Sequence, residues 1–185
     1  LQLKRLSQQL GGPRIFIKRD DQTGLALGGN KTRKLEFLVG DALAKGADTL
    51  VTLGAAQSNH CRQTAAAAVA AGLKCELILN GKRPEVANGN LLLNEILGAK
   101  LHWIERSQRT TKLKELDEDL RAAGRKPYLI PVGGSNGIGA VGYVEAMMEL
   151  RQQLRAADLR IDRLFFGTSS GGTQAGMALG ARLAG

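Results

Sequence analysis

The 185-residue sequence contains little cysteine, proline or aromatic residue, and these absences exclude several classes of protein. Two cysteines are too few for a disulfide-stabilised domain, and they form no C-x-x-C pair that would indicate a metal site. No apolar run reaches the roughly 18 residues that a membrane-spanning helix needs. Hydrophobic residues make up 43% of the chain, which excludes intrinsic disorder. We therefore expect a globular protein with reduced thiols in the cytoplasm, without a metal or a membrane partner.

Positive charge is abundant and unevenly placed. The net charge is +9, and residues 1–34 contain eight lysines and arginines against two aspartates. Such a surface attracts nucleic acids or small anions. Aromatic residues amount to only 4%, and no zinc-finger, RRM or KH pattern is present. We expect an anionic cofactor or substrate and no nucleic-acid partner, because the cations cluster beside glycines.

Apolar runs alternate with helical patterns along almost the whole chain, which predicts repeated strand–helix–strand units. Such units form a parallel sheet with right-handed crossovers, and ligands bind beyond the carboxyl ends of its strands. The loops between a strand and the next helix are therefore the places to search for a site. The predicted strands are 14–18, 49–53, 74–79, 100–104, 128–131 and 163–166, and the predicted helices are 32–45, 58–71, 90–97, 111–123, 136–155 and 173–183.

The first such loop, residues 20–34, places a lysine at the start of a helix. Asn30 separates Gly29 from Lys31, so the segment is not a P-loop. The helix dipole and the neighbouring Lys34 lower the pKa of the Lys31 amine, as a Schiff-base lysine requires. The alternative is that Lys31 is a solvated cation at a helix start, and the residues alone leave both interpretations open.

Two further loops have polar residues ahead of small-residue helices. In Gln57-Ser58-Asn59-His60, Ser58 is a good N-cap, and the free N–H groups of the helix start can bind a carboxylate or phosphate. Capping alone, with a structural His60, is the alternative. Residues 167–173 (GTSSGGT) follow an apolar strand and predict a backbone nest for phosphate, with a simple tight turn as the alternative. Cys61 lies in the first turn of a helix without an obvious base, so we interpret it as a packing residue.

Taken together, these loops resemble the fold-type-II pyridoxal-phosphate (PLP) enzymes, in the branch of D-cysteine desulfhydrase and 1-aminocyclopropane-1-carboxylate (ACC) deaminase. The resemblance implies an α/β fold of the tryptophan synthase β type, with three layers in which helices cover both faces of parallel sheets. It spans nearly the whole chain in order. The matching segments are 17–21 (IKRDD), 28–35 (GGNKTRKL), 57–62 (QSNHCR), 131–136 (PVGGSN) and 170–176 (SGGTQAG).

The resemblance also implies roles for individual residues. Lys31 would be the lysine that binds the cofactor covalently and acts in catalysis, and Asn59 would lie beside the phenolic oxygen of PLP. Ser58, a catalytic residue in the deaminase branch, would bind the substrate carboxylate with its neighbours. The residues implied as further cofactor ligands are Lys34, Ser170, Gly171, Gly172 and Thr173, and those implied as substrate-binding are Ser58, Asn59 and His60.

The resemblance implies a reaction, α,β-elimination of D-cysteine or a related sulfur amino acid to pyruvate, ammonia and sulfide. His60 after Ser-Asn and the Gln22-Thr23-Gly24 segment depart from the deaminase pattern and favour the desulfhydrase side. ACC deaminase and L-cysteate sulfo-lyase remain alternatives within the family. Outside it, a truncated, inactive PLP- or phosphate-binding fragment and a nucleotide-binding Rossmann-like module are the alternatives.

The resemblance finally implies how the chain is divided. Residues 1–34 and 146–185 would form part of a large PLP-binding domain, and residues 35–145 a small α/β domain. Members of the family continue well past residue 185, so we expect the C-terminal part of the fold to lie outside this sequence. The absence of an initiator Met before Leu1 is interpreted as trimming at the other end. The full-length protein is expected to be a homodimer.

Overall fold

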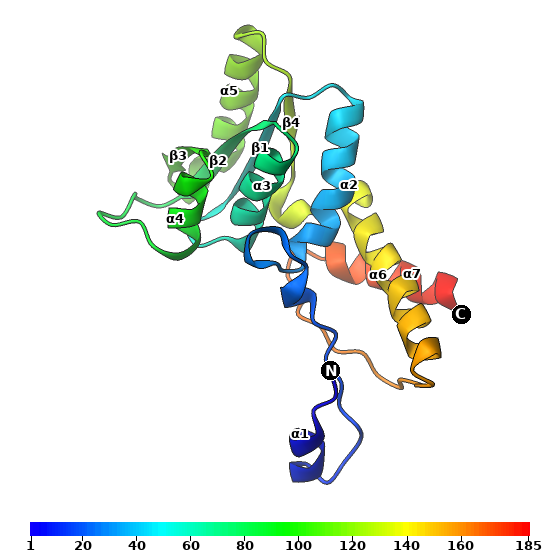
Figure 1. Cartoon of the computed structure of the whole chain (residues 1–185). Coiled ribbons are helices and arrows are strands. Elements are labelled where there is room, and N and C mark those ends of the chain that lie inside the picture. The colour runs from blue at the N-terminus through cyan, green and yellow to red at the C-terminus, as the bar shows by residue number, and fades with distance from the viewer.

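A computed structural model describes residues 1–185 and shows a parallel sheet packed between helices, with a separate helix pair beside it (Figure 1). The strands are β1 (Thr49–Ala55), β2 (Lys74–Asn80), β3 (Lys100–Ile104) and β4 (Pro127–Leu129). The α-helices are α1 (Lys4–Gln9), α2 (Lys31–Ala44), α3 (Asn59–Ala70), α4 (Gly89–Ile96), α5 (Arg109–Ala122), α6 (Gly137–Ala156) and α7 (Gly172–Ala184), and the short 3-10 turns are η1 (Asp20–Gln22), η2 (Leu25–Leu27), η3 (Arg106–Gln108) and η4 (Val132–Gly134).

The four strands pair in the order β3-β2-β1-β4, and every pair is parallel. β1 and β2 are the central strands, in register from Thr49 opposite Lys74 to Ala55 opposite Asn80. They are nearly continuous apolar runs because both faces of a parallel sheet are covered by crossover helices. The carboxyl end of β1 leads into the Gln57–His60 loop, which the sequence marks as a candidate site.

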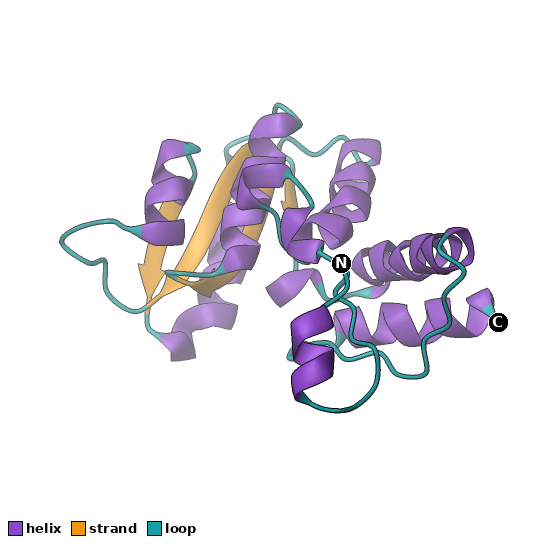
Figure 2. Ribbon diagram, turned by 60° about the horizontal axis from the view of Figure 1, so that its bottom comes forward, coloured by secondary structure: helices purple, strands orange, loops and turns teal.

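Helices cover both faces of the sheet, which gives three layers (Figure 2). One face packs against α2, α3 and α4, with Leu38, Ala65 and Leu91 in its core. The other face packs against α5 through Leu116 and Leu120. The run of alanines in α3 removes bulk between helix and sheet, so this helix lies close to β1 and β2. The α/β class, the parallel sheet and the covering helices are confirmed.

Glycines allow the helix pair α6 and α7 to pack closely, and α6 also packs along α2. A Cβ added at Gly142 of α6 would lie less than 3.0 Å from the backbone oxygen of Arg33 in α2. A Cβ at Gly176 of α7 would collide in the same way with the backbone of Ala140 in α6. Since a side chain fits at neither position, the three helices meet backbone to backbone.

Two of the six predicted strands are absent from the structure. Residues 14–18 form only an isolated antiparallel bridge between Gln2 and Phe16, and residues 163–166 form no strand. Residues 1–3 supply a few backbone hydrogen bonds to residues 14–18, too few for a strand, and no strand of this chain supplies hydrogen-bond partners to residues 163–166. Phe165 accordingly remains 85% exposed. The six predicted helices and the other four strands are confirmed, with ends displaced by at most a few residues; the division into two partial domains stays a prediction.

Candidate functional site

The amino end of α2 carries the predicted catalytic lysine. A glycine turn precedes it, with Gly28 at φ 67° and Gly29 at φ 127°, conformations that residues with side chains rarely adopt. Lys31 is half-buried and its Nζ donates to Oδ1 of Asn30 at 2.9 Å. Burial lowers the pKa of the Lys31 ammonium, which is the direction that the sequence predicts from the helix dipole and Lys34. The turn therefore presents this amine at a helix start in a more nucleophilic state than that of a surface lysine.

Lys34 lies one turn further along α2, and its side chain is buried, with only 1% exposed. Its Nζ donates to the backbone oxygen of Gly133 at 3.1 Å and to Oγ of Ser135 at 3.2 Å. Burial, followed by repulsion from Lys31, lowers the pKa of Lys34 to about 8. No carboxylate pairs with either lysine. The first turn of α2 therefore holds two cations without an anionic partner.

The glycine-rich loop before α7 reaches the same place. Oγ of Ser170 lies 2.6 Å from Oγ of Ser135, which in turn accepts from Lys34. Gly171 adopts φ 80°, and a Cβ at Gly172 would lie 2.6 Å from Oγ of Ser135. The amino end of α7, with its unpaired N–H groups, is thereby placed beside the Lys34 ammonium. A hydroxyl chain, a buried cation and a helix start converge here, as an anion site requires.

The remaining predicted loop, Gln57 to His60, lies at the amino end of α3. Oγ of Ser58 accepts from the backbone N–H of Cys61 at 3.2 Å, which confirms the N-cap geometry. The Asn59 side chain is exposed, so it is available to a ligand. The buried Cys61 thiol accords with packing, because burial raises its pKa to about 11.

The His60 imidazole instead points into the core, where it is 4% exposed. Thr52 donates its one hydroxyl proton to the backbone oxygen of Ile130, so its oxygen accepts from Nε2 of His60 at 2.9 Å. Burial, together with the lysine charges of α2, lowers the pKa of His60 to about 3. This histidine is therefore neutral, and its predicted contact with a substrate stays a prediction.

Gln63, which none of the sequence motifs includes, joins the two loops. Its fully buried amide oxygen accepts from the backbone N–H and the hydroxyl of Thr32, each at 2.8 Å, and its Nε2 donates to the backbone oxygen of Asn59 at 3.1 Å. Asn30 makes no capping hydrogen bond, so Gln63 caps α2 from another helix. The sequence offered one signal for this role: Gln63 is a polar residue in an alanine-rich helix, four residues after Asn59.

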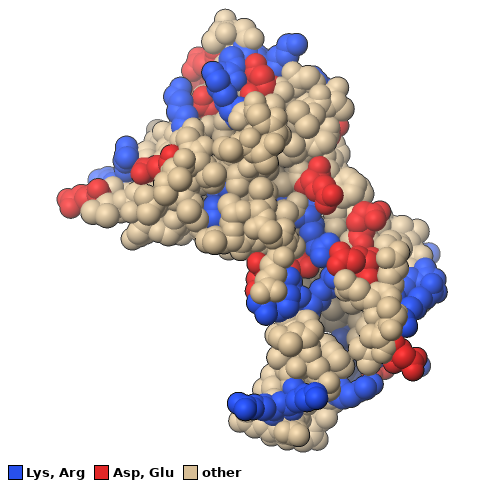
Figure 3. All heavy atoms as spheres, in the orientation of Figure 1, with Lys and Arg blue, Asp and Glu red and all other residues tan.

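The other cations near α2 are neutralised. Arg33 pairs with Asp20 at 2.9 Å and with Glu149 at 2.7 Å, and Lys18 pairs with the same Glu149 at 2.6 Å. Hydrogen bonds from Arg33 hold the pKa of Glu149 at about 2, so it stays ionised. Figure 3 shows these signs interleaved beside α6, whereas the end of the molecule around α1 is basic alone. Lys31 and Lys34, in the first turn of α2, have no such anionic partner.

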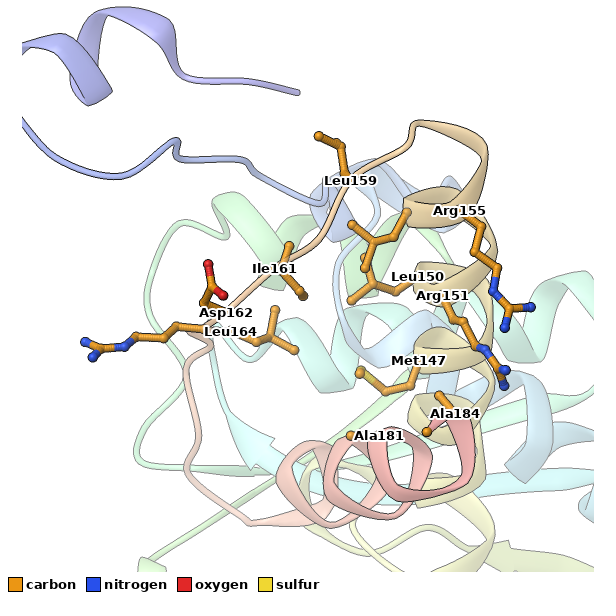
Figure 4. A pocket seen from close by; sticks show the side chains of 13 residues that line it. Met147, Leu150, Arg151, Arg155, Leu159, Ile161, Asp162, Leu164, Ala181 and Ala184 are labelled. Atoms are coloured by element: carbon orange, nitrogen blue, oxygen red, sulfur yellow. The ribbon is translucent and has the colours of Figure 1, made fainter.

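A separate hollow of about 560 Å³ lies between α6, α7 and the segment 159–164 (Figure 4). Leu150 and Leu164 are among its aliphatic lining, and Arg151 and Arg155 point outward at its rim. None of the predicted site residues lines it. Elsewhere, no cluster of three metal-ligating side chains is present, and no helix is long and apolar enough to cross a membrane.

Comparisons with known proteins agree with this geometry. The protein family described as "Pyridoxal-phosphate dependent enzyme" matches residues 1–185. A D-cysteine desulfhydrase of Klebsiella pneumoniae is 50% identical over 184 residues, which cover 96% of this chain and 56% of the relative. The crystal structure of an "ACC deaminase homologue" superposes with a TM-score of 0.88 at 44% identity, covering 97% of this chain and 54% of that one.

A more distant structure shows the fold alone. A threonine deaminase from T.th. superposes with a TM-score of 0.78 at 21% identity, covering 99% of this chain and 54% of that one. The chain therefore spans about half the length of the relatives that it matches.

Proposed function

Because the chain belongs to the family of pyridoxal-phosphate dependent enzymes, we propose that it carries the lysine and phosphate side of the active site of a carbon–sulfur lyase. The reaction is the α,β-elimination of D-cysteine, or of a related sulfur amino acid, to pyruvate, ammonia and sulfide. The observation that carries the proposal is the first turn of α2, where Lys31 and Lys34 lie without a carboxylate partner beside the amino end of α7. The 50% identity to a D-cysteine desulfhydrase supports the choice of substrate.

The residues present fit pyridoxal phosphate, which has an aldehyde at one side and a phosphate at the other. An aldehyde requires an amine with a lowered pKa, and Lys31 supplies one. A phosphate dianion requires buried cations and backbone donors, and Lys34 with Gly171, Gly172 and Thr173 supplies them. The buried ammonium of Lys34 has only neutral oxygens as partners, which leaves its charge for the phosphate.

Each predicted residue except His60, whose ring points into the core, then has a task. Lys31 binds the aldehyde, and Lys34, Ser170 and the Gly171–Thr173 turn hold the phosphate. Ser58 and the N–H groups at the start of α3 bind the substrate carboxylate, since a helix start favours an anion. Asn59 donates to the phenolic oxygen of the cofactor.

The cofactor, when bound, supplies the electron-withdrawing ring that accepts charge from the substrate Cα. The protein supplies position and proton transfer. The carboxylate contacts near Ser58 would orient the Cα–H bond for removal, and the Lys31 amine, when it is not bound to the cofactor, would take that proton on Nζ. The electron pair of the Cα–H bond would form the Cα=Cβ double bond as the bond from Cβ to sulfur breaks, and sulfide would leave with the electron pair of that bond. Hydrolysis of the released unsaturated amine by water would give pyruvate and ammonia.

A second substrate is supported by a specific observation. The "ACC deaminase homologue" structure matches this chain nearly as well in sequence, at 44% identity, so ACC deaminase is the alternative activity, with L-cysteate sulfo-lyase as a further one. Measuring ammonia release from D-cysteine, L-cysteate and aminocyclopropane carboxylate side by side separates the three. We also propose a cytoplasmic location and, for the full-length protein, a homodimer that acts on small amino acids.

The test of the proposal is the covalent link to Lys31. Pyridoxal phosphate added to the chain should give a visible absorption band, and borohydride reduction should fix the cofactor to the protein for detection by intact mass. Lys31→Ala should lose both signals. Lys45→Ala, just beyond the end of the same helix, is the control, because that lysine is 61% exposed and its partners are Asp41 and the Tyr128 ring. An undiminished band in Lys31→Ala would refute the assignment.

A further inference from the structure

The side-chain amide of Asn59 has one donor end and one acceptor end, and only the donor end suits an anionic oxygen. The cofactor's phenolic oxygen is such an atom under the proposed function, on which this inference rests. An amide free to rotate would present its carbonyl oxygen half of the time and repel the ligand. What holds the Asn59 amide in one orientation therefore affects binding.

Arg62 fixes the orientation from one side. Its Nη2 lies 3.4 Å from Oδ1 of Asn59 and donates at 3.0 Å to the backbone oxygen of Gly28. A guanidinium only donates, so the Asn59 atom that faces it is the oxygen. Arg62 is 4% exposed, its Nε and Nη1 have no partner, and no carboxylate pairs with it. An uncompensated positive charge thus lies behind the Asn59 amide and favours an anion in front of it.

Asn90 fixes the orientation from the second side. Its Nδ2 donates at 2.7 Å to Oδ1 of Asn59 and at 2.9 Å to the backbone oxygen of Gln57. A backbone oxygen can only accept, so the amide of Asn90 is itself oriented with its nitrogen toward Asn59. Both protons of that nitrogen are used. Oδ1 of Asn59 therefore receives two donors, whereas Nδ2 of Asn59 has no partner within the chain.

The start of α4 is held against this loop by several contacts. Oε1 of Gln57 accepts from the backbone N–H of Asn90 at 2.8 Å, and its Nε2 donates to Oδ1 of Asn88 at 3.0 Å. Gly89 adopts φ 51°, and a Cβ there would lie 2.6 Å from Oε1 of Gln57, so a side chain at this position would displace the Gln57 amide. The contact between Asn90 and Asn59 is thus part of a docked turn.

We propose that Asn90 and Arg62 are positioning residues that orient the Asn59 amide, so that its nitrogen donates to the phenolic oxygen of the bound cofactor. The backbone oxygen of Asn59 is bonded to Gln63, which also caps the lysine-bearing helix α2. One side chain, that of Gln63, therefore connects the residue that carries the oriented amide to the helix that carries Lys31.

Asn90→Asp tests the proposal with a substitution of the same size. The carboxylate introduced at position 90 accepts and does not donate, so the Asn59 amide turns its nitrogen toward it and presents oxygen to the ligand. Losing a hydrogen bond to a charged atom weakens binding roughly 10- to 100-fold. Asn88→Asp is the matched control, because it adds the same charge two residues away and keeps the acceptor that Gln57 uses. Its dissociation constant for pyridoxal phosphate should change less than about twofold.

A double-mutant cycle separates orientation from general damage to the loop. In an Asn59→Ala background, Asn90→Asp should no longer weaken binding, because no amide remains to be turned. Equal weakening by Asn90→Asp and Asn88→Asp would overturn the proposal. So would a loss on Asn90→Asp that persists in the Asn59→Ala background.

A measurement without cofactor keeps this inference distinguishable from the proposed function. In NMR spectra of the cofactor-free chain, both side-chain amide protons of Asn90 should exchange slowly with water, and Asn59→Ala should release one of them. Unchanged exchange of both protons would disprove the contact. If the wild-type chain shows no Lys31-dependent band, the proposed function fails, and the exchange result still decides whether Asn90 holds Asn59.

Discussion

Replacing Lys34 by methionine should stabilise the cofactor-free chain at neutral pH while removing its affinity for phosphate. The side chain of Lys34 is 1% exposed, and its ammonium meets only the backbone oxygen of Gly133 and the hydroxyl of Ser135. Methionine has a similar length and no charge, so it fills the same space without the cost of a buried cation. A residue that is unfavourable for folding is thus retained where an anion would bind.

The pKa of Lys34 sets the size of the effect. It falls from the ordinary 10.5 to about 8, which corresponds to a cost of about 3 kcal/mol for the folded state wherever the amine is charged. The variant also loses the two hydrogen bonds of Lys34, and each loss reduces the expected stabilisation by about 1 kcal/mol at most. We expect a net stabilisation of about 1–2 kcal/mol at pH 7, which raises Tm by roughly 2–8 °C in a chain of this size.

The pH dependence has a definite sign. Between pH 8 and 10.5 the unfolded chain holds a proton on Lys34 that the folded chain has released, so the stability of the wild type rises with pH in this window. Lys34→Met lacks this rise, and its advantage over the wild type should therefore disappear by about pH 10.

Thermal unfolding at pH 7 and pH 10, with and without inorganic phosphate, measures both effects. Phosphate should stabilise the wild type and have little effect on Lys34→Met. Lys45→Met, just beyond the other end of the same helix, should change stability by less than about 0.5 kcal/mol. The reasoning is refuted if Lys34→Met is less stable than the wild type at pH 7 without phosphate, or if its advantage is the same at both pH values.

Three further outcomes are expected. Gly142→Ala should destabilise the chain by several kcal/mol, because its Cβ would collide with the backbone of α2. The control Gly40→Ala, whose Cβ meets open space within α2, should stabilise the chain by up to about 1 kcal/mol. Urea unfolding of the two variants compares their free energies of unfolding. Gln63→Met should cost about 1–3 kcal/mol, because it removes the acceptor of the Thr32 hydroxyl and leaves the Thr32 N–H with only its longer bond to the oxygen of Gly29. Urea unfolding measures this loss, and a loss below about 0.5 kcal/mol would contradict the reasoning. The His60 ring should stay neutral down to about pH 4 in NMR titrations, and stability should fall as the pH drops below 6.5 towards 3, since the unfolded chain binds the proton more tightly.

Local signals made much of the fold predictable. Helix ends followed from glycines placed after apolar periodicity, as at Gly46 after α2 and Gly72 after α3. The central strands followed from apolar runs such as Leu50 to Leu53. The segments 14–18 and 163–166 failed because a strand depends on a partner, and apolar composition says nothing about whether one lies alongside.

The sequence predicted the loops of the candidate site but not the residues that connect them. Lys31, Ser58 and the glycine loop before α7 stand at the starts of helices, and the structure brings those loops together. Gln63 and Asn90 were missed because each matters through contacts about 30 residues away in sequence. The polar Gln63 within an alanine-rich helix indicates a long-range contact, but the sequence does not show which residue it contacts.

The glycines of α6 have a consequence for the accuracy of the site. Gly139 and Gly142 bring α6 against the backbone of Gly134 and Arg33, so atoms of the main chain set the spacing between α2 and the loop that receives Lys34. Main-chain atoms have no rotamers to change. Most side-chain substitutions in the core should therefore leave the distances from Lys31 and Lys34 to the surrounding loops unchanged. Substrate preference can then change through side chains around the site while the spacing of the two lysines stays the same.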